Sequence, residues 1–124
     1  MKYNEEQLHE LKKVETVFKE YIIQKNDMEL IWSDKLGYVL FLGINADMDD
    51  FCLGPMVMKN ARMLCFYMLN EIALEVISSG PKFHDIHESS ELERENIEAV
   101  FRPYLEQLPG YEDLIEDVFK DPFA

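Results

Sequence analysis

Residues 28–44 read Met-Glu-Leu-Ile-Trp-Ser-Asp-Lys-Leu-Gly-Tyr-Val-Leu-Phe-Leu-Gly-Ile, and this stretch decides the fold class. Two runs of β-branched, aromatic and aliphatic residues flank a polar turn, which is typical of a β-hairpin. Asp34 opens the turn, and Gly37 can adopt the left-handed conformation that closes a bulged hairpin loop. Both faces of the second run, residues 38–44, are apolar, so we expect other elements to cover the hairpin on both sides.

A helix precedes the hairpin. Asn4 and Gln7 fit a capping box, in which each residue satisfies a backbone N–H of the other. Apolar residues at helical spacing follow from Leu8 to Ile22. We therefore predict a first helix from about residue 5 to about residue 25.

A long helix follows the hairpin and forms the centre of the predicted fold. Pro55 suits the first turn of a helix, so we predict this helix from about residue 56 to about residue 79. It is apolar on most sides, which indicates burial between two layers. Three residues of its second apolar face are candidates for an interaction surface: Met63, Phe66 and Tyr67.

The last third of the chain predicts shorter helices after a loop at residues 82–89. Ser90 and Glu93 fit a second capping box, and the helix that they open contains Pro103, which predicts a kink or a restart. A short amphipathic helix over about residues 111–119 ends the pattern. Its polar face is a candidate docking surface for a basic protein and consists of Glu112, Asp113, Glu116 and Asp117.

The order of these elements predicts an α+β, mostly helical single domain over residues 1–124. It has an N-terminal helix, a β-hairpin, a long buried central helix, and then two or three shorter C-terminal helices. A two-stranded hairpin is marginal on its own. A third strand from residues 82–87 or pairing across a dimer would stabilise it, and the sequence leaves both alternatives open.

The formal net charge of −13 is unevenly spread along the chain. Residues 1–45 carry six basic against eight acidic residues, residues 46–80 two against five, and residues 81–124 four against twelve. A negative field repels phosphate backbones and anionic lipids, and it attracts basic proteins. We therefore expect no nucleic-acid partner and no membrane partner, and a basic protein is a possible partner of the C-terminal third.

Cysteine usage and the N-terminal sequence bear on the cellular compartment. The chain has two cysteines, Cys52 and Cys65, and their number and placement imply no disulfide framework. The N-terminal residues have no apolar segment typical of a secretory signal, and charged residues interrupt the longest apolar stretch. We expect a cytoplasmic protein.

One segment carries residue types that bind metals. His84-Asp85-Ile86-His87-Glu88 places two histidines three positions apart with carboxylates beside them. The spacing differs from the i, i+4 histidine pair of zinc proteases, and a solvated loop with two ordinary histidines is the simpler interpretation. The chain has no phosphate-binding glycine loop and no nucleophile elbow. We therefore favour a non-enzymatic protein, with no catalytic residue assigned and no cofactor expected.

The function that we favour from sequence is a protein–protein interaction or regulatory module that forms a homodimer. Pairing of the hairpins or of the long central helices would give each an additional packing partner. The alternative is a small metal-dependent enzyme or ligand-binding domain that uses His84 and His87. A further alternative is an apolar ligand pocket lined by Trp32 and Tyr67.

Overall fold

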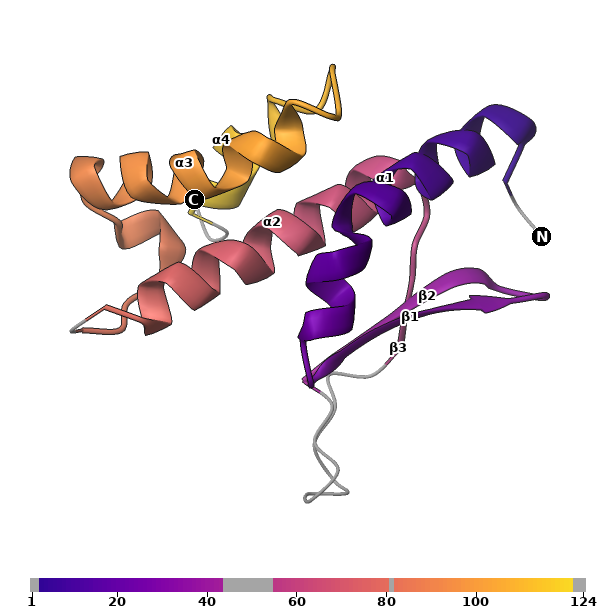
Figure 1. The fold of residues 1–124 in the computed structure, drawn as a ribbon, viewed down its shortest axis with the longest axis horizontal. Coiled ribbons are helices and arrows are strands. Elements are labelled where there is room, and N and C mark those ends of the chain that lie inside the picture. The colour runs from indigo at the N-terminus through magenta and orange to yellow at the C-terminus, as the bar shows by residue number, and fades with distance from the viewer. Residues whose placement is uncertain (1–2, 44–54, 81, 122–124) are drawn as a thin grey trace. The chain divides into compact units, whose positions relative to one another are not determined.

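A computed structural model describes residues 3–43, 55–80 and 82–121. The chain forms two compact units, residues 1–63 and residues 64–124, and the boundary falls in the first turn of the central helix. The fold is α+β and mostly helical, as predicted, whereas the single domain over the whole chain stays a prediction. The elements, shown in Figure 1, are α1 (Glu5–Gln24), β1 (Met28–Ser33), β2 (Gly37–Leu42), β3 (Pro55–Val57), α2 (Ala61–Ser78), the 3-10 helix η1 (Ile86–Glu88), α3 (Glu91–Leu105) and α4 (Leu114–Phe119).

Helix α1 begins at the predicted capping box and packs by one stripe of side chains. Asn4 Oδ1 accepts a hydrogen bond from Gln7 N at 2.7 Å, and Gln7 Oε1 accepts one from Asn4 N at 2.9 Å. Leu11, Val14 and Phe18 recur at helical spacing and are fully buried. Within the first unit, α1 lies along one face of the sheet (Figure 1).

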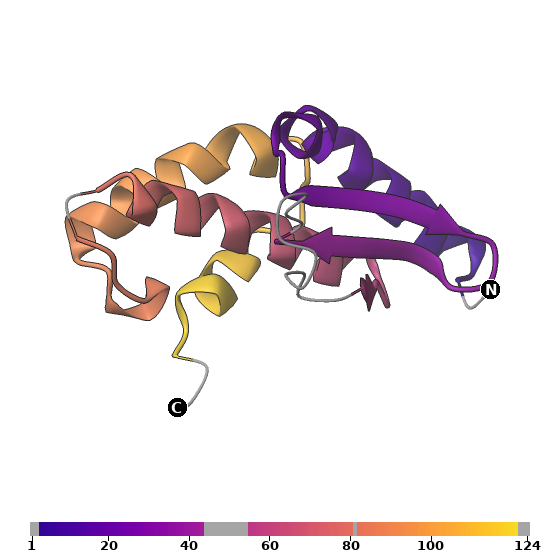
Figure 2. The same cartoon turned by 90° about the horizontal axis from the view of Figure 1, so that it is seen from below.

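The sheet of the first unit is antiparallel, with the strand order β1-β2-β3. Figure 2 shows β1 and β2 side by side, joined by the predicted tight turn. Gly37 has φ +86, as the hairpin loop requires. The third strand therefore comes from within the chain, which answers one of the alternatives left open by the sequence.

For this region, one alternative that the sequence left open and one sequence prediction are wrong. Residues 82–87 do not form the third strand, because residues 55–57 pair with β2 instead, in a register that sets Met56 opposite Leu40. For the same reason, the central helix does not begin near residue 56. It begins at Ala61, where Asn60 Oδ1 accepts a hydrogen bond from Met63 N at 2.9 Å and caps the first turn.

The second unit contains most of α2, then η1, α3 and α4. Helix α2 is 18 residues long, and the side chains of Leu64, Cys65, Met68 and Leu69 are fully buried, as expected for the central helix. Among the described residues, no helix is both long enough and apolar enough to span a membrane.

Helix α3 begins at Glu91 and is capped by Ser90, whose Oγ accepts a hydrogen bond from Glu93 N at 3.2 Å. It continues through Pro103 and ends at Leu105, so this proline lies in the last turn. The predicted C-terminal helices are thus present, and the rings of Phe101 on α3 and Phe119 on α4 pack with centroids 6.4 Å apart.

Candidate functional site

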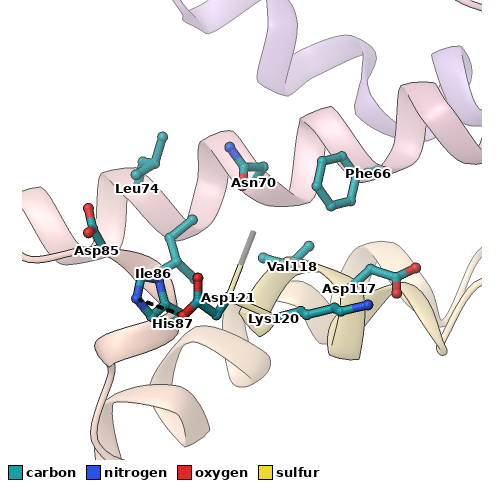
Figure 3. Close-up of a pocket in the computed structure, with 10 residues that line it drawn as sticks. All are labelled: Phe66, Asn70, Leu74, Asp85, Ile86, His87, Asp117, Val118, Lys120 and Asp121. Carbon is teal, nitrogen blue, oxygen red and sulfur yellow. Dashed lines mark ion pairs between the residues drawn. The ribbon is translucent and has the colours of Figure 1, made fainter. Parts of the chain in front are cut away.

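The second unit contains a surface pocket of about 510 Å³. Three segments form it: one face of α2, η1 with the residue before it, and the end of α4 with the residues that follow it (Figure 3). The lining residues are Phe66, Asn70, Leu74, Asp85, Ile86, His87, Asp117, Val118, Lys120 and Asp121.

The pocket has an apolar wall and a charged rim. Figure 3 shows His87 and Asp121 facing one another across the rim, although they are 34 positions apart in the sequence. His87 Nε2 lies 3.9 Å from Asp121 Oδ2. The interaction joins η1 to the residues after α4, so it helps to position both walls of the pocket.

Helix η1 brings three potential metal ligands together. One ligand atom each from Asp85, His87 and Glu88 lies within 4.8 Å of the other two. A 3-10 helix has three residues per turn, so Asp85 and Glu88, three positions apart, lie on the same side of it. Glu88 Oε1 accepts a hydrogen bond from Asp85 N at 3.3 Å. An imidazole nitrogen with two carboxylates is a ligand set for a divalent transition metal.

His84, the other histidine of the predicted cluster, has different partners. Its Nε2 lies 2.6 Å from Glu93 Oε1 on α3, and its Nδ1 lies 2.8 Å from the carbonyl oxygen of Asp85. These two acceptors, the carbonyl first and the carboxylate second, raise the pKa of the His84 imidazole above its usual value. The structure therefore groups Asp85, His87 and Glu88, and places His84 at the N-terminal end of α3.

The three predicted interaction residues on α2 are half-buried, and each contacts a neighbouring residue. Phe66 lines the pocket, and its ring packs edge-to-face on Tyr67 with centroids 5.5 Å apart. The sulfur of Met63 accepts a hydrogen bond from Lys59 N at 3.4 Å. These contacts leave part of each side chain accessible, so a role in binding stays a prediction.

The predicted acidic surface is exposed in the second unit. Its four carboxylates belong to Glu112, Asp113, Glu116 and Asp117, all of which are exposed. Glu116 pairs with Arg94 of α3, and Asp117 lies at the edge of the pocket. The acidic face therefore adjoins the pocket rim.

The other predicted ligand residues lie in different units. Trp32 lines a shallow depression of about 500 Å³ in the first unit, together with Leu8, Lys12, Glu15 and Tyr38. Tyr67 lies on the part of α2 that belongs to the second unit. The apolar pocket that was predicted from these two residues stays a prediction.

Sequence reasoning missed a row of apolar side chains on the sheet. Ile31, Val39 and Val57 are directly opposite one another in β1, β2 and β3. Ile31 is 38% exposed and Val57 is 41% exposed, while Val39 between them is buried. Tyr38 is on the opposite face, where it contacts α1 through Glu15. Alternation along β1 predicts which face of the sheet carries Ile31. The place of Val57 in this row could not be predicted, because it depends on the pairing of β3 with β2.

No protein-family model matches the chain, and no significant match was found among curated proteins or solved structures.

Proposed function

We propose that the protein is a non-enzymatic interaction module that forms a homodimer through the sheet of its first unit. The row formed by Ile31, Val39 and Val57 is the observation that carries this proposal. Two of these three β-branched side chains keep more than a third of their surface exposed on a sheet face turned away from α1. Burying such a face contributes about 25 cal/mol for each Å² of apolar surface removed from water.

The edge of the sheet supports the same proposal. Among the described residues, β1 has one hydrogen-bonded neighbour, β2, so its other edge is available for pairing. The strand is six residues long and includes the exposed side chains of Ile31 and Trp32. An edge strand of this kind pairs readily with another chain, and antiparallel pairing with its own copy satisfies two-fold symmetry.

The distribution of charge favours a second copy on this face over other surfaces. Residues 1–63 contain eight basic and eleven acidic residues, a net charge of −3, and residues 64–124 contain four and fourteen, a net charge of −10. Two copies therefore repel each other least through their first units. On the face that carries Ile31, the described strands contribute a single charged residue, Glu29.

The absolute mass of the full chain in solution, measured by light scattering after size-exclusion chromatography, tests the proposal. We expect about 29 kDa, twice the 14.6 kDa of one chain. Ile31→Lys and Val57→Lys should each shift the mass to that of the monomer, because they place a charge in the interface. Leu92→Lys is the matched control, since Leu92 is 68% exposed on α3, and it should leave the dimer intact. A wild-type monomer at every concentration, or an Ile31→Lys dimer, would contradict the proposal.

The acidic surface of the second unit favours a second candidate function, docking of a basic protein. Its support is the charge of −10 on residues 64–124 and the exposure of Glu112, Asp113 and Asp117. Opposite charge speeds association, and salt screens this effect. Oligolysine should bind at low salt, and Glu112→Gln with Asp117→Asn should weaken that binding. Binding that is equally strong in high salt would overturn this candidate.

The cytoplasm remains the proposed location, and this rests on the sequence alone.

A further inference from the structure

We propose that Asp85, His87 and Glu88 bind a divalent transition-metal ion at the rim of the pocket in the second unit. These three residues belong to the second unit, whereas the proposed dimer face belongs to the first. One potential ligand atom of each residue lies within 4.8 Å of the others. Two ligand atoms on opposite sides of an ion with bonds of 2.0–2.2 Å are at most about 4.4 Å apart. Small rotations of the exposed Asp85 and Glu88 side chains close this difference.

The backbone of η1 holds these ligands on an ordered turn. Glu88 N donates to the carbonyl oxygen of Asp85 at 3.0 Å, and Ser89 N donates to that of Ile86 at 3.1 Å. All three ligand residues therefore lie within one hydrogen-bonded turn, and little backbone entropy is lost when an ion binds. The exposed carboxylates leave a path from solvent to the site.

A fourth group comes from a distant part of the second unit. Asp121 Oδ2 lies 3.9 Å from His87 Nε2, on the pocket side of the imidazole (Figure 3). Asp121 is not one of the three residues whose ligand atoms lie within 4.8 Å of one another, so it acts on the site by orienting the His87 imidazole and not as a ligand. The ion binds the folded turn of η1, so metal binding should also stabilise this unit against unfolding.

The donor set selects the class of ion. Ca²⁺ and Mg²⁺ prefer sites made of oxygen ligands alone, whereas an imidazole nitrogen among carboxylates suits Zn²⁺ and related transition metals. His84 is outside the site, because its two ring nitrogens lie against the carbonyl oxygen of Asp85 and the carboxylate of Glu93. His84 is thus a matched control for His87.

Titration of the full chain with zinc chloride in a calorimeter tests the inference. We expect one Zn²⁺ for each chain and no comparable binding of Mg²⁺. His87→Ala should weaken Zn²⁺ binding by about tenfold or more. Removal of a residue that only hydrogen-bonds to a metal ligand already lowers the metal affinity by about 10–100-fold, and loss of a ligand should cost at least as much. Glu88→Gln should weaken Zn²⁺ binding in the same direction, while His84→Ala should leave the affinity within about twofold. Equal affinities of the wild type and His87→Ala would overturn the inference, as would an equal loss in His84→Ala.

Two further measurements keep the test independent of variant folding. In the wild type, Co²⁺ should shift or broaden the imidazole resonances of His87 much more than those of His9. Zn²⁺ should also raise the thermal unfolding temperature of the wild type and raise that of Asp121→Asn by less. Equal effects on both imidazoles, or an unchanged unfolding temperature in the wild type, would overturn the inference.

Discussion

The ring of Tyr3 occupies the space that a side chain at Gly37 would need. A Cβ atom built on Gly37 lies 2.5 Å from Tyr3 Cε2, which is closer than carbon atoms approach without displacement. Tyr3 is held there by its hydroxyl, which accepts a hydrogen bond from Tyr38 N at 3.2 Å and donates one to the carbonyl oxygen of Met58. The segment before α1 is thereby attached to the end of the hairpin and to the residue that follows β3.

Gly37→Ala should destabilise the first unit strongly. The alanine would have to adopt φ +86, which costs about 1–2 kcal/mol for an L-residue. The Tyr3 ring would also have to move, with the loss of two hydrogen bonds worth about 1 kcal/mol each. Urea unfolding followed by the fluorescence of Trp32, the single tryptophan of the chain, measures the change in this unit.

Gly110→Ala is the control for the conformational part of this cost. Gly110 has φ +95, and a Cβ atom there would meet nothing within 4 Å. Its substitution, followed by circular dichroism, should therefore cost only about 1–2 kcal/mol. In a Tyr3→Ala background, which has already lost the ring and its two hydrogen bonds, Gly37→Ala should cost only the conformational part. An excess that persists in this background would show that the two residues do not interact in this way.

The elements with strong local patterns could be predicted from the sequence. The capping residues Asn4 and Gln7 and the apolar spacing that follows them specify α1 to within one residue at its C-terminal end. The turn that ends at Gly37 likewise specifies the hairpin. In each case the deciding residues are a few positions apart, so local propensity and tertiary structure agree.

The elements that depend on distant pairing could not be predicted. Strand β3 has three residues, begins with a proline that also suits a helix start, and exists because it pairs with β2. Proline is tolerated there because β3 is an edge strand. The proximity of Asp121 to His87 is equally nonlocal, so the sequence predicted the metal-ligand types at 84–88 without their fourth neighbour.

Asn60→Ala should destabilise the start of α2. Asn60 carries the local signal that the sequence analysis overlooked, because its Oδ1 accepts a hydrogen bond from Met63 N at 2.9 Å. Loss of such an N-cap costs about 1 kcal/mol, and hydrogen exchange at the Met63 amide should accelerate. Asn60→Asp keeps the acceptor and should retain the wild-type stability in urea. If both variants lose the same free energy of unfolding, the side-chain cap is not the stabilising contact.

Glu15→Gln should lower the pKa of the Tyr38 phenol. In the wild type, burial first, and then the hydrogen bond to Glu15 with its negative charge, raise this pKa well above the ordinary value of 10.0. The Tyr38 hydroxyl donates to Glu15 Oε1 at 2.8 Å, a contact that only the protonated phenol can make. The ultraviolet absorbance of phenolate, compared with that of Tyr38→Phe, isolates this tyrosine from the other five.

The same shift predicts how stability depends on pH. A group whose pKa is higher in the folded state stabilises that state below its unfolded pKa, and this contribution is lost as the pH rises further. The free energy of unfolding of the first unit should therefore fall above about pH 10, and the fall should be smaller in Glu15→Gln. Identical pH profiles for the two proteins would rule out the Tyr38–Glu15 pair as the cause.

Arg94→Ala should destabilise the second unit by about 1–2 kcal/mol, because the guanidinium connects α3 with α4. Its Cζ atom lies 4.6 Å from the centroid of the Phe119 ring, a contact worth about 0.5–1 kcal/mol at a partly exposed site. It also pairs with Glu98 at 3.6 Å and with Glu116, and exposed pairs contribute about 0.2–1 kcal/mol each.

Arg94→Lys keeps the charge but loses the planar group that stacks on Phe119, so it should recover less than half of the loss. Urea unfolding followed by circular dichroism at low and high salt separates the two contributions, since salt weakens the ion pairs more than the ring contact. Full recovery by lysine would instead assign the effect to charge alone.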